Sequence, residues 1–493
     1  MINITRKLLL SDVCCRYVTC GVVLLLAAAG CSSEWEGTSV EPAGSEVVEE
    51  PPFAQTESDL HYNSSSYLDY LLRWRLEYNG VKPVEPPAQQ DPALVELGRN
   101  LFFEREIAGP RNIACSTCHN PTLGSADAQS QSRGQGAVGL GPSRRQDGDE
   151  FFEFLPRNAL SLWNRGVPEW KTMFWDGRLG EDEQGTFFSP AGDDTPQDVS
   201  NALALFSIIP VTPDQEMRGF PGQLDRFGEI NEMSELTNDD FPIIWDLVVQ
   251  RVLATEGYDQ LLRDAFPNKS ESEIGISELV NAMGAFQTEA FTALDTPFDR
   301  YLAGDNSAMS DNAKRGANLF YGRANCASCH SGGILSDQDF HNIAAPQVGT
   351  GRGETADIGL DLGRGAITGN AEENFRFRTP PLRNIELESP YFHNGAYDLL
   401  EDAIRHHLDP ATALANYDDN QVEEALRGNF RTEVNGELLS TIDPALAVSG
   451  RPLNEYEIGY LMDFMAALTD RASLNLLRLV PDNLPSGLPL AEN

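Results

Sequence analysis

Two copies of one short pattern constrain this chain more than any other feature. The pattern is Cys-x-x-Cys-His, formed by Cys115, Cys118 and His119 in the first copy and by Cys326, Cys329 and His330 in the second. Two thiols one helical turn apart, followed at once by a histidine, are the attachment signature of c-type haem. The thiols bond the two vinyl groups, and the histidine becomes the proximal iron ligand. The sequence therefore predicts two covalent haem c groups.

The remaining cysteines leave no thiols for structural disulfides. The chain has eight cysteines, and those outside the two motifs all lie near the N-terminus, at Cys14, Cys15, Cys20 and Cys31. A redox Cys-x-x-Cys pair or a zinc site shared by four cysteines would use the same motif thiols. The histidine that follows both copies favours haem over these alternatives.

The N-terminus has the features of an export signal. Arg6 and Lys7 precede an apolar stretch at residues 21–30 that is too short to span a membrane. The run Ala-Ala-Gly-Cys31 resembles a bacterial lipobox, in which cleavage leaves Cys31 as a lipidated N-terminus; an uncleaved anchor is the alternative. Ser32 then indicates the outer membrane. We expect a periplasmic lipoprotein of the bacterial cell envelope, which fits haem attachment outside the cytoplasm.

Charge and composition divide the rest of the chain. A net charge of -39 excludes nucleic-acid binding, which needs clustered Lys and Arg, and would steer a basic protein partner toward the surface. An acidic stretch rich in Pro, Ser and Glu follows Cys31 and cannot bury enough surface to fold. The expected segments are a lipoprotein signal peptide (1–30), a disordered acidic tether (31–60), an N-terminal haem c domain (61–295), a C-terminal haem c domain (296–475) and an extended tail (476–493).

The sequence before each motif is also repeated. Helical spacing of Leu and aromatic residues occurs at residues 97–103 and again at residues 314–321. Asp91-Pro92 and Ser310-Asp311 are suitable N-terminal caps for these helices. Strand-like alternation is scarce. The fold class expected from an internal duplication is mainly α, with two cytochrome c-type domains, one covalent haem in each, and long ordered loops.

Further motifs, in this order, resemble the bacterial diheme cytochrome c peroxidase family. They are Arg157-Asn158, FWDGR at residues 174–178, PVTPDQEM at residues 210–217, and FRTPPLRNIELESPYFHNG at residues 377–395. The resemblance runs from about residue 91 to residue 468. Extra residues between the second and third motifs make that stretch align less closely. The family includes the enzyme that matures methylamine dehydrogenase by oxidising its tryptophans.

The resemblance implies a peroxidase that reduces hydrogen peroxide to water. In the family the N-terminal haem reacts with peroxide beneath a glutamate, which is Glu216 here, and a carboxylate at that position acts as general acid and base. Electrons come from a small cytochrome c or copper protein, enter at the C-terminal haem and pass an aromatic residue, which is Trp175 here. The alternatives are a protein-modifying oxidase of the tryptophan-oxidising branch and a noncatalytic diheme electron carrier.

The two irons are expected to differ in their sixth ligand. Family members that need reductive activation close the N-terminal haem with a loop histidine, but none lies between His119 and Arg157. That iron is therefore expected to be open. The family position for the relay ligand, counted from Pro390, falls on His407, with His406 as the alternative if the register slips by one. The relay haem is thus expected to have two histidine ligands.

The resemblance also implies a calcium ion between the domains. The family positions are the side chain of Asn158 and the backbone carbonyls of Glu388 and Pro390, all oxygen donors suited to a hard cation.

Other polar residues have roles that the sequence leaves open. Arg157, Arg178 and Arg383 are candidates to pair with haem propionates. His341 and His393 occupy family positions that are not ligands, and we expect them to form hydrogen bonds around the haem. A homodimer is left open, and the membrane is expected to be contacted only through the N-terminal lipid.

Overall fold

The computed structural model describes residues 64–148, 151–446, 452–474 and 476–490. The expected signal peptide, the acidic tether and the lipidated Cys31 lie outside the described residues.

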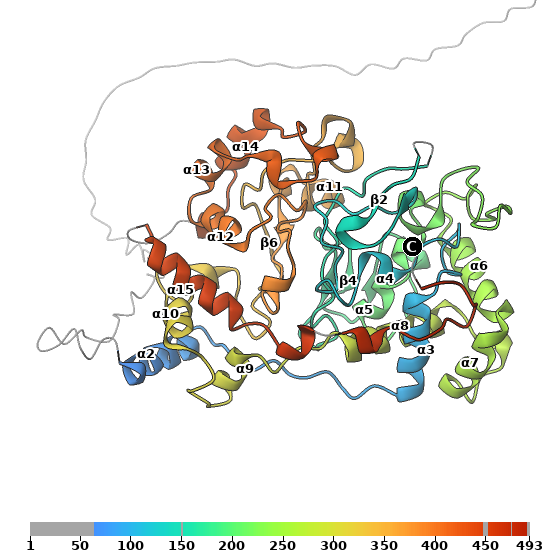
Figure 1. The fold of residues 1–493 in the computed structure, drawn as a ribbon, viewed down its shortest axis with the longest axis horizontal. Coiled ribbons are helices and arrows are strands. Elements are labelled where there is room, and N and C mark those ends of the chain that lie inside the picture. The colour runs from blue at the N-terminus through green and yellow to red at the C-terminus, as the bar shows by residue number, and fades with distance from the viewer. Residues whose placement is uncertain (1–63, 149–150, 447–451, 475, 491–493) are drawn as a thin grey trace, which may run out of the picture. The chain divides into compact units, whose positions relative to one another are not determined.

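Helices predominate, and the strands are only two or three residues long (Figure 1). The α-helices are α2 Ser65–Tyr78, α3 Pro92–Phe103, α4 Cys115–Cys118, α5 Ala202–Phe206, α6 Phe241–Ala254, α7 Asp259–Ala265, α8 Ile276–Ala290, α9 Pro297–Leu302, α10 Asp311–Phe320, α11 Arg364–Thr368, α12 Leu400–Leu408, α13 Pro410–Ala415, α14 Asn435–Ser440 and α15 Glu455–Ala466. The strands, all paired antiparallel, are β1 Ala137–Val138 with β2 Arg145–Gln146, β3 Thr172–Met173 with β4 Leu179–Glu181 and β5 Phe187–Phe188, and β6 Phe340–His341 with β7 Phe377–Arg378. The expected helix-rich fold is confirmed. Within the described ranges, no helix has the length and apolar character needed to cross a membrane.

The two helices that precede the motifs begin at the expected caps. The Asp91 carboxylate accepts a hydrogen bond from the Ala93 amide at 2.8 Å at the start of α3. The Ser310 hydroxyl accepts one from the Ala313 amide at 3.1 Å at the start of α10. Each cap satisfies an amide that has no partner within its helix, which fixes where the helix starts.

A glycine in each of these helices permits a close crossing with a later helix. A Cβ atom on Gly98 of α3 would lie 1.8 Å from the carbonyl oxygen of Ala282 in α8. A Cβ atom on Gly316 of α10 would lie at the same distance from the carbonyl oxygen of Tyr460 in α15. Only glycine allows backbones to approach this closely. The same crossing therefore recurs in both halves, as an internal duplication predicts.

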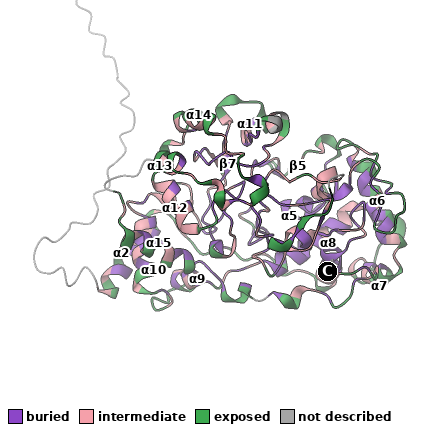
Figure 2. Ribbon diagram, turned by 45° about the horizontal axis from the view of Figure 1, so that its top comes forward, coloured by how far each residue is buried: buried purple, intermediate pink, exposed green. Residues whose placement is uncertain are grey.

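The buried apolar side chains form two large separate clusters. The first packs around α3, α5, α6 and α8, and the second around α10 and α15. Figure 2 shows the buried residues of α5 and α8 in the first cluster and of α10 and α15 in the second. Each Cys-x-x-Cys-His motif lies beside one cluster, since Cys115 packs against the first and Cys326 against the second.

The two ends of the described chain exchange places. The N-terminal end packs on the second cluster and the C-terminal end on the first, which a simple split at residue 295 does not predict. Helix α2 lies beside α10 (Figure 1), where Lys314 forms a buried ion pair with Asp69 at 2.8 Å. Residues 476–490 return to the first cluster, where the Ser486 hydroxyl donates a hydrogen bond to the Glu104 carboxylate at 2.7 Å. The segment 64–78 thus belongs by packing to the C-terminal half, and the tail belongs to the N-terminal half.

Candidate active site

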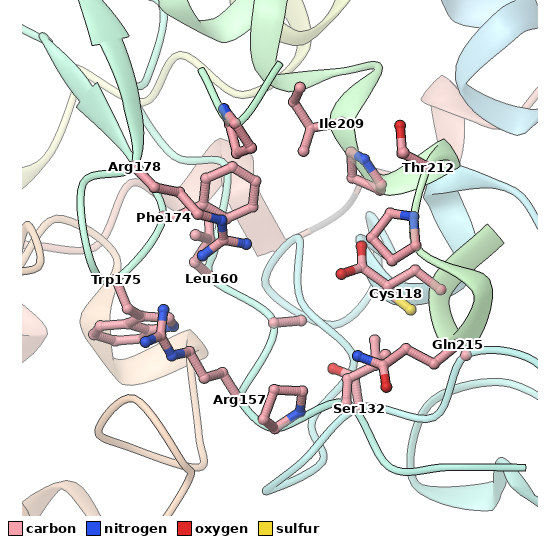
Figure 3. Close-up of a pocket in the computed structure, with 18 of the residues that line it drawn as sticks. Cys118, Ser132, Arg157, Leu160, Phe174, Trp175, Arg178, Ile209, Thr212 and Gln215 are labelled. Carbon is pink, nitrogen blue, oxygen red and sulfur yellow. The ribbon is translucent and has the colours of Figure 1, made fainter. Parts of the chain in front are cut away.

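A large cavity of about 1390 Å³ opens beside the first motif. Helix α4 is a single turn, so it presents Cys115 and Cys118 to this cavity together, with His119 at its end. Figure 3 shows Cys118, Thr212 and Gln215 on one side of the cavity, with Arg157, Trp175 and Arg178 on the other. The thiols and the imidazole that would hold a haem therefore face a space large enough to contain one.

The imidazole of His119 is oriented for metal binding through Nε2. Its Nδ1 donates a hydrogen bond to the carbonyl oxygen of Ser125 at 3.2 Å, so Nε2 is the nitrogen that could bind a metal. Burial lowers the pKa of His119 to about 4, so the ring is neutral at physiological pH. His119 is the one histidine among the described residues that line this cavity.

Glu216 faces the same cavity from a short π-helical turn, Asp214–Arg218. Neighbouring contacts fix this turn: the Gln135 amide donates to the carbonyl oxygen of Gln215 at 2.9 Å, and Met217 is buried in the first cluster. Single π-helical turns are rare and occur often at functional sites. The backbone that carries Glu216 is therefore held in place by its neighbours on both sides.

The surroundings of Glu216 keep its carboxyl titratable near neutral pH. Burial raises the pKa of Glu216 to about 6, against the attraction of Arg178 and Arg352. A carboxyl with this pKa can both accept and return a proton under physiological conditions.

Charged residues from both halves of the chain meet on the far side of this cavity. Arg157 binds Asp361 through two bonds of 2.6 and 2.9 Å and Asp176 through one of 2.7 Å. Arg178 bonds Asp176 at 2.9 Å, and Arg352 lies 3.3 Å from the same carboxylate. Burial would raise the pKa of Asp176, but these three arginines lower it. Arg157 and Arg178, candidates for propionate binding, are therefore already ion-paired within the protein.

Trp175 borders both this cavity and a second one. Its indole Nε1 donates to the carbonyl oxygen of Asn158 at 3.1 Å, and its own carbonyl accepts from the Arg378 amide at 2.8 Å. The ring is thus held by Asn158 of the N-terminal half, and the backbone of Trp175 is held by Arg378 of the C-terminal half. Its place between the two cavities is the one expected for a bridging aromatic residue.

The second cavity brings together the second motif and His407. Cys326, Cys329, His330 and His407 all line it. The ring centroids of His330 and His407 are 6.3 Å apart. Two imidazoles that share an iron at metal–nitrogen distances of about 2 Å have ring centres roughly 6 Å apart. The two histidines therefore fit a haem iron bound between them.

Hydrogen bonds distinguish His407 from its neighbour His406. The Nδ1 of His407 bonds the carbonyl oxygen of Ala403 at 2.8 Å, and the Nδ1 of His330 bonds that of Leu335 at 3.2 Å. In both rings Nε2 is left for a metal. In His406 both nitrogens are engaged: Nδ1 with the Tyr397 hydroxyl at 2.9 Å, and Nε2 with a backbone carbonyl at 2.8 Å. His406 is buried and is not among the residues that line the second cavity. The geometry supports the predicted register.

The three residues expected to bind calcium lie together at the second cavity. Asn158, Glu388 and Pro390 all line it. The Asn158 amide nitrogen donates to the carbonyl oxygen of Gln129 at 2.8 Å, which leaves the amide oxygen as a ligand. Burial raises the pKa of the Glu388 carboxyl to about 7, and its Oε1 has no hydrogen-bond partner. The expected donors are the Asn158 amide oxygen and the backbone carbonyls of Glu388 and Pro390, which suit a hard cation.

His341 lies between two carboxylates next to the second motif. Its Nδ1 and Nε2 bond Asp443 at 2.7 Å and Asp337 at 2.9 Å. The hydrogen bond to Asp337 is the largest of the influences that raise the pKa of His341 to about 11, so the ring is an imidazolium at neutral pH. Cys329, Asp337 and His341 also lie within 4.8 Å of one another, as metal ligands can. Cys329 belongs to the haem-attachment motif, however, so the cluster forms part of the surroundings of that motif.

His393 has a different environment from His341. It is buried and stacks on Phe377, with the ring centroids 3.6 Å apart. Its Nε2 has no hydrogen-bond partner in the protein. Its backbone carbonyl oxygen accepts a hydrogen bond from the backbone amide of Asn158 at 2.8 Å. His393 therefore supports the segment that carries the expected calcium and bridging residues.

Sequence reasoning missed the contribution of a distant segment to the first cavity. Arg352 and Arg364 line it although they follow the second motif in the chain. Arg364 donates to the carbonyl oxygens of Asp176 and Gly177 at 2.9 and 3.0 Å. No local pattern marks these two arginines, because their role depends on a contact between residues far apart in the sequence.

Comparison with known proteins identifies the family. The model of the family described as di-haem cytochrome c peroxidase matches residues 92–307. The methylamine utilization protein MauG of Methylorubrum extorquens is 31% identical over 320 residues, which cover 64% of this chain and 69% of that protein. The cytochrome c551 peroxidase of Pseudomonas aeruginosa is 27% identical over 360 residues, which cover 72% and 80%. The chain belongs to the diheme cytochrome c peroxidase family.

Solved structures agree with this fold. A MauG-like protein associated with microbial copper homeostasis has a TM-score of 0.53 at 22% identity, covering 82% of this chain and 97% of that one. The diheme peroxidase BthA from Burkholderia thailandensis has a TM-score of 0.51 at 20% identity, covering 80% and 91%. The family membership supports an oxidoreductase with two haem c groups, as the motifs predict.

Proposed function

We propose that this protein is a peroxidase that reduces hydrogen peroxide to water at the first cavity. This proposal rests mainly on the difference between the surroundings of the two motif histidines. His119 faces an open cavity with Glu216, whereas His330 faces a second histidine at ligand spacing. An enzyme of this kind needs one site that admits substrate and another that only relays electrons.

Glu216 is the proposed acid and base. A haem iron bound at His119 would supply the redox chemistry and the position at which peroxide binds. The Glu216 carboxylate would take the proton from the proximal peroxide oxygen and return it to the distal oxygen, so that water leaves instead of hydroxide. The positive charges of Arg178 and Arg352 attract the Glu216 carboxylate, which keeps part of the carboxyl ionised despite its burial.

The proposed electron route leads from the second cavity to the first. His330 and His407 would hold the relay haem, and Trp175, which borders both cavities, would shorten the path between them. The proposed donor is a small cytochrome c or copper protein. A basic donor would be favoured by the net charge of -39.

We further propose calcium at Asn158, Glu388 and Pro390, and a lipid anchor at Cys31. The grouping of the first three residues at one cavity supports the calcium site. The anchor rests on the sequence alone and would place the protein in the periplasm at the outer membrane.

The fully oxidised protein is expected to react with peroxide without prior reduction, because the cavity offers Glu216 but no second histidine to block the iron. The test mixes the ferric diheme protein with hydrogen peroxide in a stopped-flow spectrometer. An immediate change in the Soret band is expected. A strict requirement for one-electron reduction before any change would contradict the open-site proposal.

The rate at low peroxide should depend on pH through Glu216. The carboxylate is the base, and burial raises its pKa to about 6, so the active form increases as the pH rises through that value. We expect kcat/KM for peroxide to rise about tenfold per pH unit well below pH 6 and to level off above pH 7. Steady-state assays from pH 4.5 to 8 measure this. A flat profile over that range would remove Glu216 from the rate-limiting proton transfer.

A second candidate is oxidation of side chains on a partner protein. It is favoured by the open first cavity and by the similarity to MauG. Sustained turnover of peroxide with a reduced small cytochrome c would favour the peroxidase. Rapid reaction with peroxide but no turnover with such donors would favour the protein-modifying oxidase.

A further inference from the structure

Two buried arginines lack the ion pairs that their burial requires. Arg165 is 4% exposed and Arg378 is 1% exposed, and neither has a carboxylate within 4.0 Å in the part of the chain that the structure describes. Other buried arginines have such a carboxylate partner. Arg157 binds two aspartates, and Arg383 binds Asp299 at 2.7 Å. Burying a cation without a counter-charge is strongly unfavourable.

The contacts of these two arginines only partly use their nitrogens. Arg165 Nε donates to the carbonyl oxygen of Ser161, but Nη1 has no partner. Arg378 Nε donates to the carbonyl oxygen of Phe174 at 3.0 Å, and Nη1 reaches a second carbonyl at 3.5 Å. Both guanidiniums lie against the ring of Trp170, at 4.5 and 4.7 Å from its centroid. Each side chain is thus fixed in place, and each guanidinium retains N–H donors that could bind a ligand.

The nearest acids do not neutralise them. Burial lowers the pKa of Arg165 to about 10, with the charge of Glu388 opposing the shift. Burial and the charge of Arg165 lower the pKa of Arg378, with Asp176 opposing. Asp176 is already bonded to other arginines. The protein alone therefore leaves two positive charges uncompensated here.

The location of these charges indicates what compensates them. Arg165 and Arg378 both line the second cavity, which also holds Cys326, Cys329 and His330. A haem carries two propionates, and guanidinium groups bind carboxylates strongly and with defined geometry. We infer that Arg165 and Arg378 receive the propionates of the haem in the second cavity. The candidates from the sequence, Arg157, Arg178 and Arg383, each already have an aspartate partner, and none of the three lines the second cavity.

This arrangement should set the potential of the relay haem. Two cations beside the propionates cancel negative charge that would otherwise favour ferric iron, so they stabilise the ferrous form. The Arg378 side chain also donates a hydrogen bond to the carbonyl oxygen of Phe174, and its backbone amide donates one to the carbonyl oxygen of Trp175. The residue that compensates a propionate therefore also positions the backbone of the proposed bridging tryptophan. The inference rests on a haem in the second cavity, and it does not depend on peroxide chemistry.

The test is a spectroelectrochemical titration of the diheme holoprotein and its Arg165→Gln and Arg378→Gln variants. Gln keeps hydrogen-bonding capacity and removes the charge. In each variant, the ferrous-to-ferric ratio of the relay haem at a fixed potential is expected to fall by at least about tenfold. This corresponds to a reduction potential lower by about 59 mV for a one-electron couple. Arg165→Lys and Arg378→Lys keep the charge and should retain most of the native potential.

Arg383→Gln is the matched control, because Arg383 is equally buried in the same half but lies outside the cavity lining and is paired with Asp299. It should cost stability and leave the relay potential unchanged. Loss of haem in a Gln variant with retention in the matching Lys variant would also support the inference. An unchanged potential in both Gln variants, or a shift confined to the other haem, would overturn it.

Discussion

Replacement of Glu216 by Gln is expected to lower peroxide turnover by about two to four decades, the usual effect of removing a general acid and base. Gln has nearly the same size and can still form hydrogen bonds, but it cannot take a proton from peroxide. Because Glu216 lies on a turn fixed by its neighbours, the fold and both covalent haems should be retained. Steady-state assays with a reduced small cytochrome c measure the change, and the absorbance of the purified variant reports haem content.

Glu153→Gln is a matched control for this experiment. Glu153 lines the same cavity, but its side chain is exposed to solvent. Its turnover should stay within about twofold of the wild-type value. Native turnover in Glu216→Gln, or an equal loss in both variants, would show that Glu216 has no special role.

Replacement of His407 by Gly is expected to abolish the low-spin signal of the relay haem. The 6.3 Å spacing of the His330 and His407 rings fits two imidazoles on one iron, and glycine removes one of them. The thioether bonds through Cys326 and Cys329 should keep the haem in place. Electron paramagnetic resonance of the ferric protein should change from low spin to high spin. Added imidazole should restore the low-spin signal, because the substitution leaves a space of its size.

His406→Gln is the corresponding control. Both nitrogens of His406 are engaged with Tyr397 and a backbone carbonyl, and Gln can both donate and accept in that environment. The relay haem should remain low-spin in this variant. Loss of the signal in His406→Gln with retention in His407→Gly would mean that the register is wrong by one residue. Retention in both would place the ligand elsewhere.

The parts of the structure that could be predicted depend on local sequence. The caps at Asp91 and Ser310 determine where α3 and α10 begin, and the thiol spacing within each motif requires only one helical turn. The repeated Gly98 and Gly316 follow from the same duplication, although their close approach to α8 and α15 became evident only in three dimensions. His407 was reached by counting along a family motif, and the ring geometry supports it.

The parts that could not be predicted depend on contacts between distant residues. The π-helical turn that presents Glu216 is fixed partly by Gly134, where a Cβ atom would lie 2.0 Å from the carbonyl oxygen of Gln215. Arg352 reaches the first cavity from beyond the second motif. Arg165 lies in no motif, and its unpaired charge appears only when the burial of its neighbours is known. Periodicity and spacing carry no information on such contacts.

The exchanged packing of the chain ends has a consequence for the order of assembly. Translation delivers the N-terminal half first, yet the first hydrophobic cluster includes Leu476 and Leu484, which follow every residue of the second cluster in the sequence. Glu104, at the end of α3, likewise obtains its bond from Ser486 only after the second half has been made. The half that is synthesised first is therefore finished last. The first hydrophobic cluster can therefore close only after the second half has been translated, so the first half stays incomplete while the second half is being made.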